Sequence, residues 1–182
     1  VINVAHASDE AIVQTAEASS HPIIYSHGGF QHFVNLPRCI SDRAARAIAA
    51  KGGVIGIQFG NSFNNPRYFE WTRSRTPARP ARPARTGPGR YASMSLVEVD
   101  REVAKGLPFV FRGTIPKEIA MGTAQLARVI DYGVKLVGDD HMALGSDFDG
   151  GPPLPVEMKD ISDYPEMTKA MQRLGYSEQR IR

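Results

Sequence analysis

Short apolar runs alternate with amphipathic segments along most of the chain. Four runs have the composition of buried β-strands, and they cover residues 1–6, 22–27, 54–59 and 141–147. Apolar residues at three- and four-residue spacing predict helices over residues 7–20, 41–51, 115–137 and 164–174. No hairpin signal joins consecutive strands, so helical crossovers connect them and the strands are expected to be parallel. The pattern therefore predicts an α/β fold with four parallel strands.

Local signals support the helix boundaries. Ser8 and Ser41 are expected N-caps, because a serine hydroxyl accepts a hydrogen bond from a free amide of the first turn. The Gly pair at 52–53 ends the second helix. Residues 176–182 are typical of the first turns of one more helix, and the chain starts inside a strand. We therefore expect the sequence to be a piece of a longer protein.

The stretch from Gly60 to about Pro116 interrupts this rhythm. Its middle, residues 76–89, contains a Pro-Ala-Arg repeat that forms neither a helix nor a central strand. We expect an extended or disordered excursion there, followed by a short helix over 95–105 and a short extended piece over 107–111. The chain is thus interpreted as one partial barrel domain, 1–182, with an irregular Arg/Pro-rich insert at about 60–95.

Composition narrows the class only slightly. The hydrophobic content of 42% and the charged content of 23% are ordinary for a globular protein. No apolar run reaches the roughly 20 residues that a membrane-spanning helix needs. The single cysteine, Cys39, excludes an internal disulfide. The net charge of +3 comes from the insert, since residues 65–92 hold seven arginines and one acid, Glu70.

Two histidines are the first candidates for chemistry. His6 and His27 each close a strand-like run, and the helix between them makes one parallel βαβ unit. Both imidazoles are then expected at the carboxyl edge of neighbouring strands, roughly 5 Å apart. There they could share a metal ion, since neutral imidazole is a common zinc ligand. The alternative is a pair of buried, hydrogen-bonded histidines.

Two further residues lie at the same predicted edge. Asp147 follows the fourth strand and could orient or deprotonate a metal-bound water, although Asp-Gly at 149–150 also fits a simple turn. Arg38 lies in the loop after the second strand and could bind a substrate carboxylate through two hydrogen bonds, or be merely solvated.

The remaining histidines and the cysteine are weaker candidates. His21 and His141 precede their strands and are expected to be structural, and Cys39 to be a small buried residue. His32 lies on the candidate edge and could touch a substrate. The arginine run could bind nucleic acid, but its flanking aromatics are not interleaved with the arginines, so a solvated insert is favoured.

Together these motifs resemble the membrane (renal) dipeptidase family, zinc-dependent metallopeptidases with an amidohydrolase-like barrel. The resemblance covers nearly all of the chain except about 60–95, where a reading-frame slip would explain the foreign repeat. It rests on His-Ala-Ser-Asp at 6–9, Pro-Ile-Ile-Tyr-Ser-His at 22–27, Arg38, Gly-Gly-Val-Ile-Gly-Ile at 52–57, Gly-Ser-Asp-Phe-Asp-Gly at 145–150, Asp-Ile-Ser-Asp-Tyr-Pro at 160–165 and Gly-Tyr-Ser-Glu at 175–178.

The resemblance implies the carboxyl-terminal half of a TIM-like (β/α)8 barrel that hydrolyses dipeptides. His6 and His27 fall on the histidines that bind the second of two zinc ions (Zn2+). Arg38 falls on the arginine that binds the free carboxylate of the dipeptide. Asp147 falls on the aspartate credited with proton transfer at the scissile bond. The His-x-Asp pair of the first zinc and the bridging glutamate belong upstream of Val1 and are absent from this sequence.

Two hypotheses follow. In the first, the chain is part of a zinc dipeptidase, impaired alone because upstream metal ligands are absent, and its partners are a dipeptide substrate and the missing amino-terminal half of the barrel. A homodimer and a different metal hydrolase of the same barrel group remain open, and no compartment is assigned. In the second, the chain is a catalytically dead half-barrel or interaction module whose basic insert binds an acidic partner.

Overall fold

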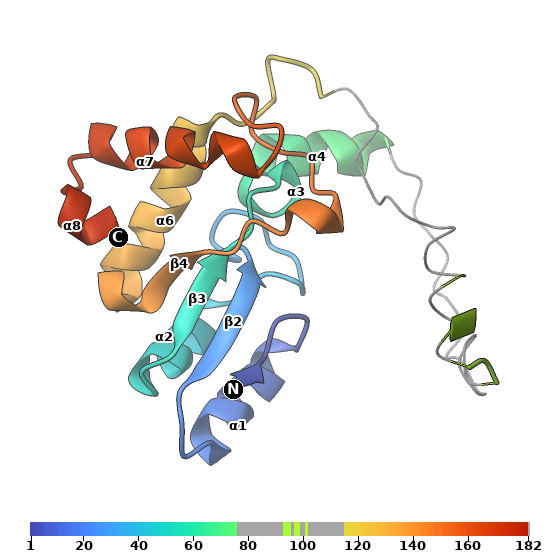
Figure 1. Cartoon of the computed structure of the whole chain (residues 1–182), viewed down its shortest axis with the longest axis vertical. Coiled ribbons are helices and arrows are strands. Elements are labelled where there is room, and N and C mark those ends of the chain that lie inside the picture. The colour runs from blue at the N-terminus through green and yellow to red at the C-terminus, as the bar shows by residue number, and fades with distance from the viewer. Residues whose placement is uncertain (76–92, 96, 99–100, 102–114, 182) are drawn as a thin grey trace.

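The sheet is parallel throughout and contains four strands. The computed structural model describes residues 1–75, 93–95, 97–98, 101 and 115–181. The strands lie side by side in the order β1-β2-β3-β4, which is also their order in the sequence. Their bounds are β1 (Ile2–Asn3), β2 (Ile23–Gly28), β3 (Val54–Ile57) and β4 (Met142–Leu144). The arrangement is that of consecutive βα units, as Figure 1 shows.

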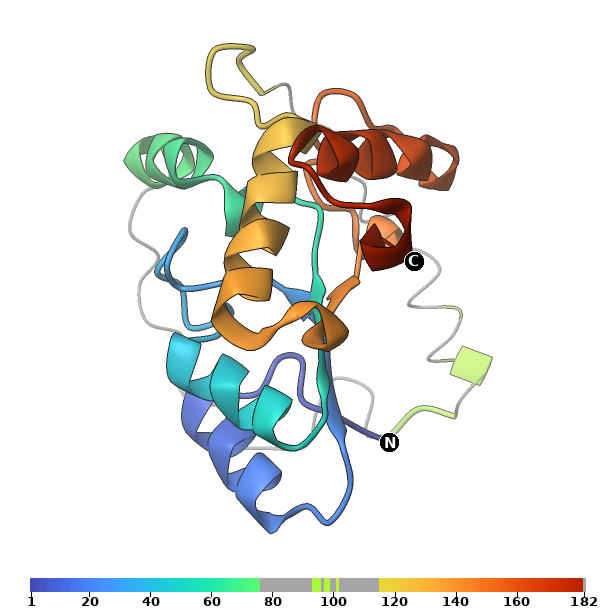
Figure 2. The same ribbon diagram turned by 90° about the vertical axis from the view of Figure 1, so that its left-hand side faces the viewer.

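Helices cover one face of this sheet. α1 contacts α2, and α2 contacts α6, so these helices lie one after another along that face (Figure 2). α7 packs on α6. The helices are α1 (Asp9–Ala18), α2 (Asp42–Ala50), α3 (Asn61–Asn64), α4 (Pro66–Arg75), α6 (Thr123–Val137), α7 (Tyr164–Arg173) and α8 (Glu178–Ile181). Among the described residues, no helix is long and apolar enough to cross a membrane.

The core lies between the sheet and these helices. Alternate residues of the two central strands point to the helical face, and burial of each such side chain contributes about 1.5–3 kcal/mol. The helices contribute apolar residues at helical spacing to the same layer. The side chains in this layer that are at most 1% exposed include Ile23, Tyr25, Ile55, Ile57, Ile12, Ile48 and Leu126.

The helix starts predicted from capping residues are confirmed. The Ser8 side chain accepts a hydrogen bond from the amide of Ala11, and the Ser41 side chain does the same for Ala44. Gly52 follows α2 with a φ of 69°, a conformation that costs glycine little. The last two helices, α7 and α8, also lie where the pattern predicts them.

Three predictions need correction. The strands are shorter than predicted; β1 has only two residues. The helix expected over 115–137 begins at Thr123, because side chains of the preceding region hold 115–122 in turns. Helices α3 and α4 occupy residues 61–75, which the sequence pattern left irregular. Predictions for 76–92, for 107–111 and for most of 95–105 lie outside the described residues.

Candidate metal centre

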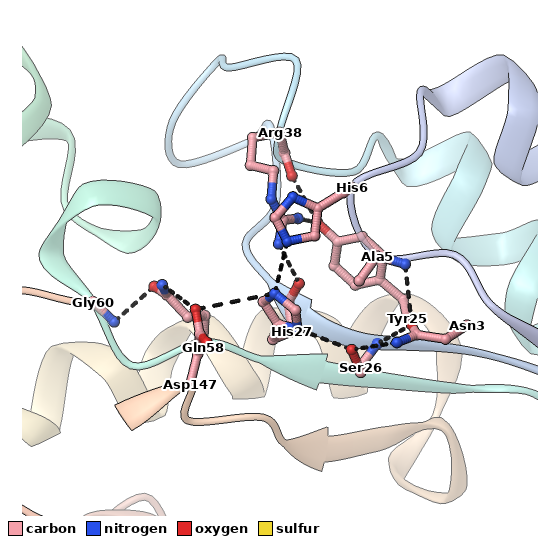
Figure 3. Close-up of polar contacts among 10 residues, drawn as sticks. All are labelled: Asn3, Ala5, His6, Tyr25, Ser26, His27, Arg38, Gln58, Gly60 and Asp147. Carbon is pink, nitrogen blue, oxygen red and sulfur yellow. Dashed lines mark hydrogen bonds and ion pairs between the residues drawn. The ribbon is translucent and has the colours of Figure 1, made fainter. Parts of the chain in front are cut away.

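Three predicted side chains meet at the carboxyl ends of the strands (Figure 3). Residues 2 and 3 pair with residues 23 and 24, and the same offset places His6 opposite His27. The ring centroids of these histidines are 5.1 Å apart, and their Nε2 atoms are 3.1 Å apart. Asp147, beyond β4, places Oδ2 4.0 Å from the Nε2 of His27.

The backbone is strained at two of these residues. His6 has a φ of 70° and Asp147 a φ of 60°, and they are the non-glycine residues with positive φ in the described part of the chain. This left-handed conformation costs on the order of 1–3 kcal/mol for each residue and occurs preferentially at functional sites. The surrounding fold therefore holds both side chains in orientations that local preference disfavours.

The surroundings of His27 favour the neutral form of its imidazole. Its side chain is 23% exposed. Burial lowers the pKa of His27; the nearby Asp147 carboxylate opposes this shift, whereas Arg38 and His6 add to it. A neutral ring keeps one nitrogen lone pair free, which is the form that binds a metal.

The second ring nitrogen of His27 has a protein partner. Its Nδ1 atom lies 2.9 Å from the hydroxyl oxygen of Ser26. That oxygen also accepts a hydrogen bond from the side-chain amide of Asn3 at 2.9 Å. Metal-binding histidines commonly have such a partner on the other ring nitrogen, which fixes the orientation of the ring.

Asp147 is held by a buried glutamine that the sequence analysis did not single out. Gln58 is 5% exposed, and its Nε2 donates to Oδ2 of Asp147 at 3.2 Å. Its Oε1 accepts from the amide of Gly60 at 2.9 Å, so the orientation of the side-chain amide is fixed. The signal that could have found Gln58 is a polar residue directly after a fully apolar strand.

Close backbone packing brings β4 to this edge. A Cβ atom on Gly145 would lie 2.0 Å from the carbonyl oxygen of Ser26, and one on Gly56 would lie 2.1 Å from the same oxygen. Only glycine fits at both positions. The approach places the residues after β4 next to His27.

Arg38 is tied to the same edge. Its guanidinium donates to the carbonyl oxygen of His27 at 3.2 Å and to the Tyr25 hydroxyl at 3.1 Å. The Tyr25 hydroxyl in turn donates to the Arg38 carbonyl oxygen at 2.8 Å. Burial raises the pKa of Tyr25, which therefore stays a neutral donor. The guanidinium also stacks over the Tyr25 and Phe63 rings.

The donor set fits part of a zinc site. Zn–N bonds of about 2.0–2.1 Å at a tetrahedral angle separate two nitrogens by roughly 3.3 Å, close to the Nε2 separation of His6 and His27. The Asp147 carboxylate lies too far from His27 for the same ligand shell but within reach of a bound water. In the described ranges, no group of three or more His, Cys, Asp or Glu side chains is arranged to hold a metal ion. Since catalytic zinc typically takes three protein ligands, these residues supply an incomplete site.

A separate cavity does not coincide with this site. It has a volume of about 900 Å³ and is lined by residues of α6, β4, α7 and α8, including Met142, Met167 and Arg180. None of the candidate residues at the strand ends lines it. The convergence of side chains, and not the size of a cavity, therefore defines the candidate centre.

The other sequence candidates lie elsewhere. His141 contacts the Gly53 carbonyl oxygen through Nδ1, as expected of a structural residue. His21 is exposed, and its Nδ1 lies 2.9 Å from the hydroxyl oxygen of the neighbouring Ser20. His32 stacks on Tyr132 of α6 at a centroid distance of 4.2 Å. Cys39 is buried, at 2% exposure, as predicted.

The fold is that of solved dipeptidases. The probable dipeptidase PvdM from Pseudomonas aeruginosa superposes with a TM-score of 0.68 at 24% identity, covering 100% of this chain and 46% of that one. A Rhodobacter sphaeroides metallopeptidase, solved with a phosphinate mimic of the dipeptide L-Ala-D-Ala, gives a TM-score of 0.66 at 21% identity, covering 99% and 38%. The predicted fold class, four parallel strands and helices of a TIM-like barrel, is confirmed.

The sequence places the chain in a family. Residues 1–182 match the membrane dipeptidase family, peptidase family M19, and the chain belongs to it. An uncharacterized Klebsiella pneumoniae protein from the pqqA 5' region is 27% identical over 97% of this chain and 48% of its own length. Dipeptidase tcpJ of Claviceps purpurea is 22% identical over 100% of this chain and 31% of its own length. The chain thus spans about half, or less, of the length of these relatives.

Proposed function

We propose that this chain is the carboxyl-terminal part of a zinc-dependent dipeptidase barrel. The supporting observation is the convergence of His6, His27 and Asp147, with the two Nε2 atoms 3.1 Å apart, in a chain of the M19 family. Membership in a metallopeptidase family gives this geometry its chemical meaning, because the same pair of imidazoles in an unrelated protein would be only a hydrogen bond.

The histidines would hold the second zinc ion through Nε2, and the ligands of the first ion would come from residues outside this chain. When bound, zinc lowers the pKa of a coordinated water and polarises the scissile carbonyl. His27 is suited to its role because burial keeps it neutral. Its Nδ1 then carries the proton and donates to Ser26.

Asp147 moves a proton at the scissile bond. Its Oδ2 accepts a hydrogen bond from Gln58 and faces His27, which fixes the orientation of the carboxylate. At 29% exposure the carboxylate remains accessible to water and substrate. It takes a proton from the attacking water and returns it to the departing amine.

Arg38 binds the free carboxylate of the dipeptide. The contacts described above use two of the five N–H donors of its guanidinium, which holds the group in place and leaves donors for a substrate. A planar guanidinium matches a carboxylate through two parallel hydrogen bonds. The proposed substrate class is therefore a small peptide with a free carboxyl terminus.

The isolated chain is expected to bind zinc weakly and to hydrolyse no dipeptide, because the described residues supply an incomplete ligand set. A chain extended with the amino-terminal half of a family barrel is expected to hydrolyse L-Ala-D-Ala in a chelator-sensitive reaction, and the His27→Ala variant of that protein to lose the reaction. Full activity of that variant, or appreciable chelator-sensitive activity of the isolated 182-residue chain, would contradict the assignment. The alternative of a binding module rests on the arginine repeat at 76–89, which lies outside the described residues.

A further inference from the structure

The side chain of Asn3 contacts both segments that carry the histidine pair (Figure 3). Its Oδ1 accepts hydrogen bonds from the amides of Ala5 at 3.1 Å and Ser26 at 3.3 Å. Its Nδ2 donates to the hydroxyl oxygen of Ser26 at 2.9 Å. Because two N–H donors require the oxygen, the orientation of the Asn3 side-chain amide is fixed.

The first contact shapes the turn that presents His6. A side-chain oxygen that binds the amide two residues later offers the backbone an alternative to the strand ladder. β1 ends at Asn3, the amide of Ala7 then donates to the carbonyl oxygen of Val4, and His6 takes its positive φ. Asn3 thus helps to turn the chain so that the His6 ring faces β2.

The other contacts fix the ring of His27. Ser26 is held by Asn3 at its amide and at its hydroxyl, and the hydroxyl oxygen lies 2.9 Å from Nδ1 of His27. With Nδ1 held on this side, Nε2 points toward His6. One asparagine therefore reaches both histidines, one through the backbone turn and the other through Ser26.

We infer that Asn3 is a positioning residue that sets the spacing of the two Nε2 atoms for metal binding. The inference rests on the proposed function in one respect, that these nitrogens hold a metal. The geometric part of the inference concerns the metal-free chain and can be tested without any activity. Asn3 is exposed, so its replacement leaves the buried core in place.

The experiment uses the purified 182-residue chain and four variants. Asn3→Ala removes all contacts of the side chain. Ser26→Ala removes the hydroxyl that joins Asn3 to His27 and keeps the hydrogen bonds of the Asn3 oxygen with the amides of Ala5 and Ser26. Asn3→Asp keeps the oxygen that binds the amides of Ala5 and Ser26, and its second oxygen accepts the Ser26 hydroxyl proton, so the Ser26 oxygen can still accept from Nδ1. Asn35→Ala, an exposed loop asparagine, is the matched control.

Two NMR readouts separate position from metal binding. In the metal-free protein, amide hydrogen exchange at residues 5 and 26 and the cross-relaxation between the rings of His6 and His27 report the geometry. Paramagnetic line broadening of these rings by Co2+ measures even weak metal affinity. Asn3→Ala is expected to speed exchange at both amides, weaken the ring contact and reduce Co2+ affinity about tenfold or more, the range seen for outer-shell partners of metal ligands.

The variants are expected to differ in a defined way. Ser26→Ala should lose Co2+ affinity while the amide of residue 5 stays protected, Asn3→Asp should retain affinity within about threefold, and Asn35→Ala should match the wild type. Unchanged exchange and ring contact in Asn3→Ala, or Co2+ affinity equal to wild type, would overturn the inference. If the wild type binds no Co2+ at all, the proposed metal site fails, and the exchange and ring data alone decide whether Asn3 positions the histidines.

Discussion

Replacement of Gln58 by leucine tests whether the contact with Asp147 exists in solution. The substitution removes the hydrogen bond from Nε2 to the carboxylate and leaves the buried amide of Gly60 without its side-chain partner. A hydrogen bond to a charged group contributes about 1.5–3 kcal/mol, and the lower end applies here because Asp147 is 29% exposed. The unsatisfied amide costs about 1–2 kcal/mol more.

The apolar leucine side chain offsets part of this loss, by about 1 kcal/mol. We expect Gln58→Leu to lower the free energy of unfolding by about 2 kcal/mol, measured by urea denaturation followed by circular dichroism. Gln14→Leu is the matched control, since Gln14 is an exposed residue of α1 whose amide also donates to a carboxylate, that of Glu10. It should change stability by less than about 0.5 kcal/mol.

A double-mutant cycle then isolates the pair. Asp147→Gly removes the carboxylate and accommodates the positive φ, so the relief of backbone strain cancels between the two arms of the cycle. The coupling energy between Gln58→Leu and Asp147→Gly is expected to be about 1 kcal/mol. A coupling below about 0.3 kcal/mol would refute the view that Gln58 holds the carboxylate, whatever the cost of the single substitutions.

Three further predictions concern α6 and the surroundings of the centre. The Lys135 side chain lowers the pKa of Asp131, so the ionised carboxylate stabilises the fold at pH values above its ordinary pKa of 3.8. This stabilisation is lost as the pH falls through the pKa of Asp131 in the folded state. Denaturation curves between pH 3 and 7 should therefore show a smaller loss of stability on acidification for Asp131→Asn than for wild type. Gly145→Ala should destabilise by about 1–3 kcal/mol or more in urea, because its Cβ meets the Ser26 carbonyl oxygen and not a flexible side chain; a neutral effect would contradict the packing of β4. Tyr25→Phe removes a hydroxyl that joins both ends of one arginine and should cost about 0.5–1.5 kcal/mol by the same assay, while in a complete enzyme it should raise KM for dipeptides more than it lowers kcat.

Features with local causes could be predicted from the sequence. The caps Ser8 and Ser41 act on amides three residues away, so their neighbours in the sequence contain all the information. The parallel sheet follows from apolar runs separated by helical segments. The register offset also follows, because equivalent positions in consecutive βα units fall on equivalent positions of the strands, which places His6 opposite His27.

Features with distant causes could not be predicted from the sequence. The region 115–122 has an apolar pattern that continues into α6, yet Asn61 accepts from the Met121 amide and Asn65 donates to the Ile119 carbonyl oxygen, which holds the segment in turns. Asn65 also caps α4, since its side-chain oxygen accepts hydrogen bonds from the amides at the start of that helix. The Asn-Pro pair at 65–66 was the local signal for that helix, but proline and arginine in the following residues obscured it.

The candidate site also has a part that the sequence predicts and a part that it does not. The residue types of His6, His27 and Asp147 and their places at strand ends were visible in the sequence, whereas the left-handed backbone at His6 and Asp147 was not. Such strain persists only where the surrounding structure determines it. Here Asn3 binds the amide of Ala5, next to His6, and Gln58 binds the carboxylate of Asp147. A sequence selected for stability alone would place glycine or asparagine at the two strained positions. The strain accepted at His6 and Asp147 therefore indicates that the fold maintains the arrangement of these side chains for a use other than folding.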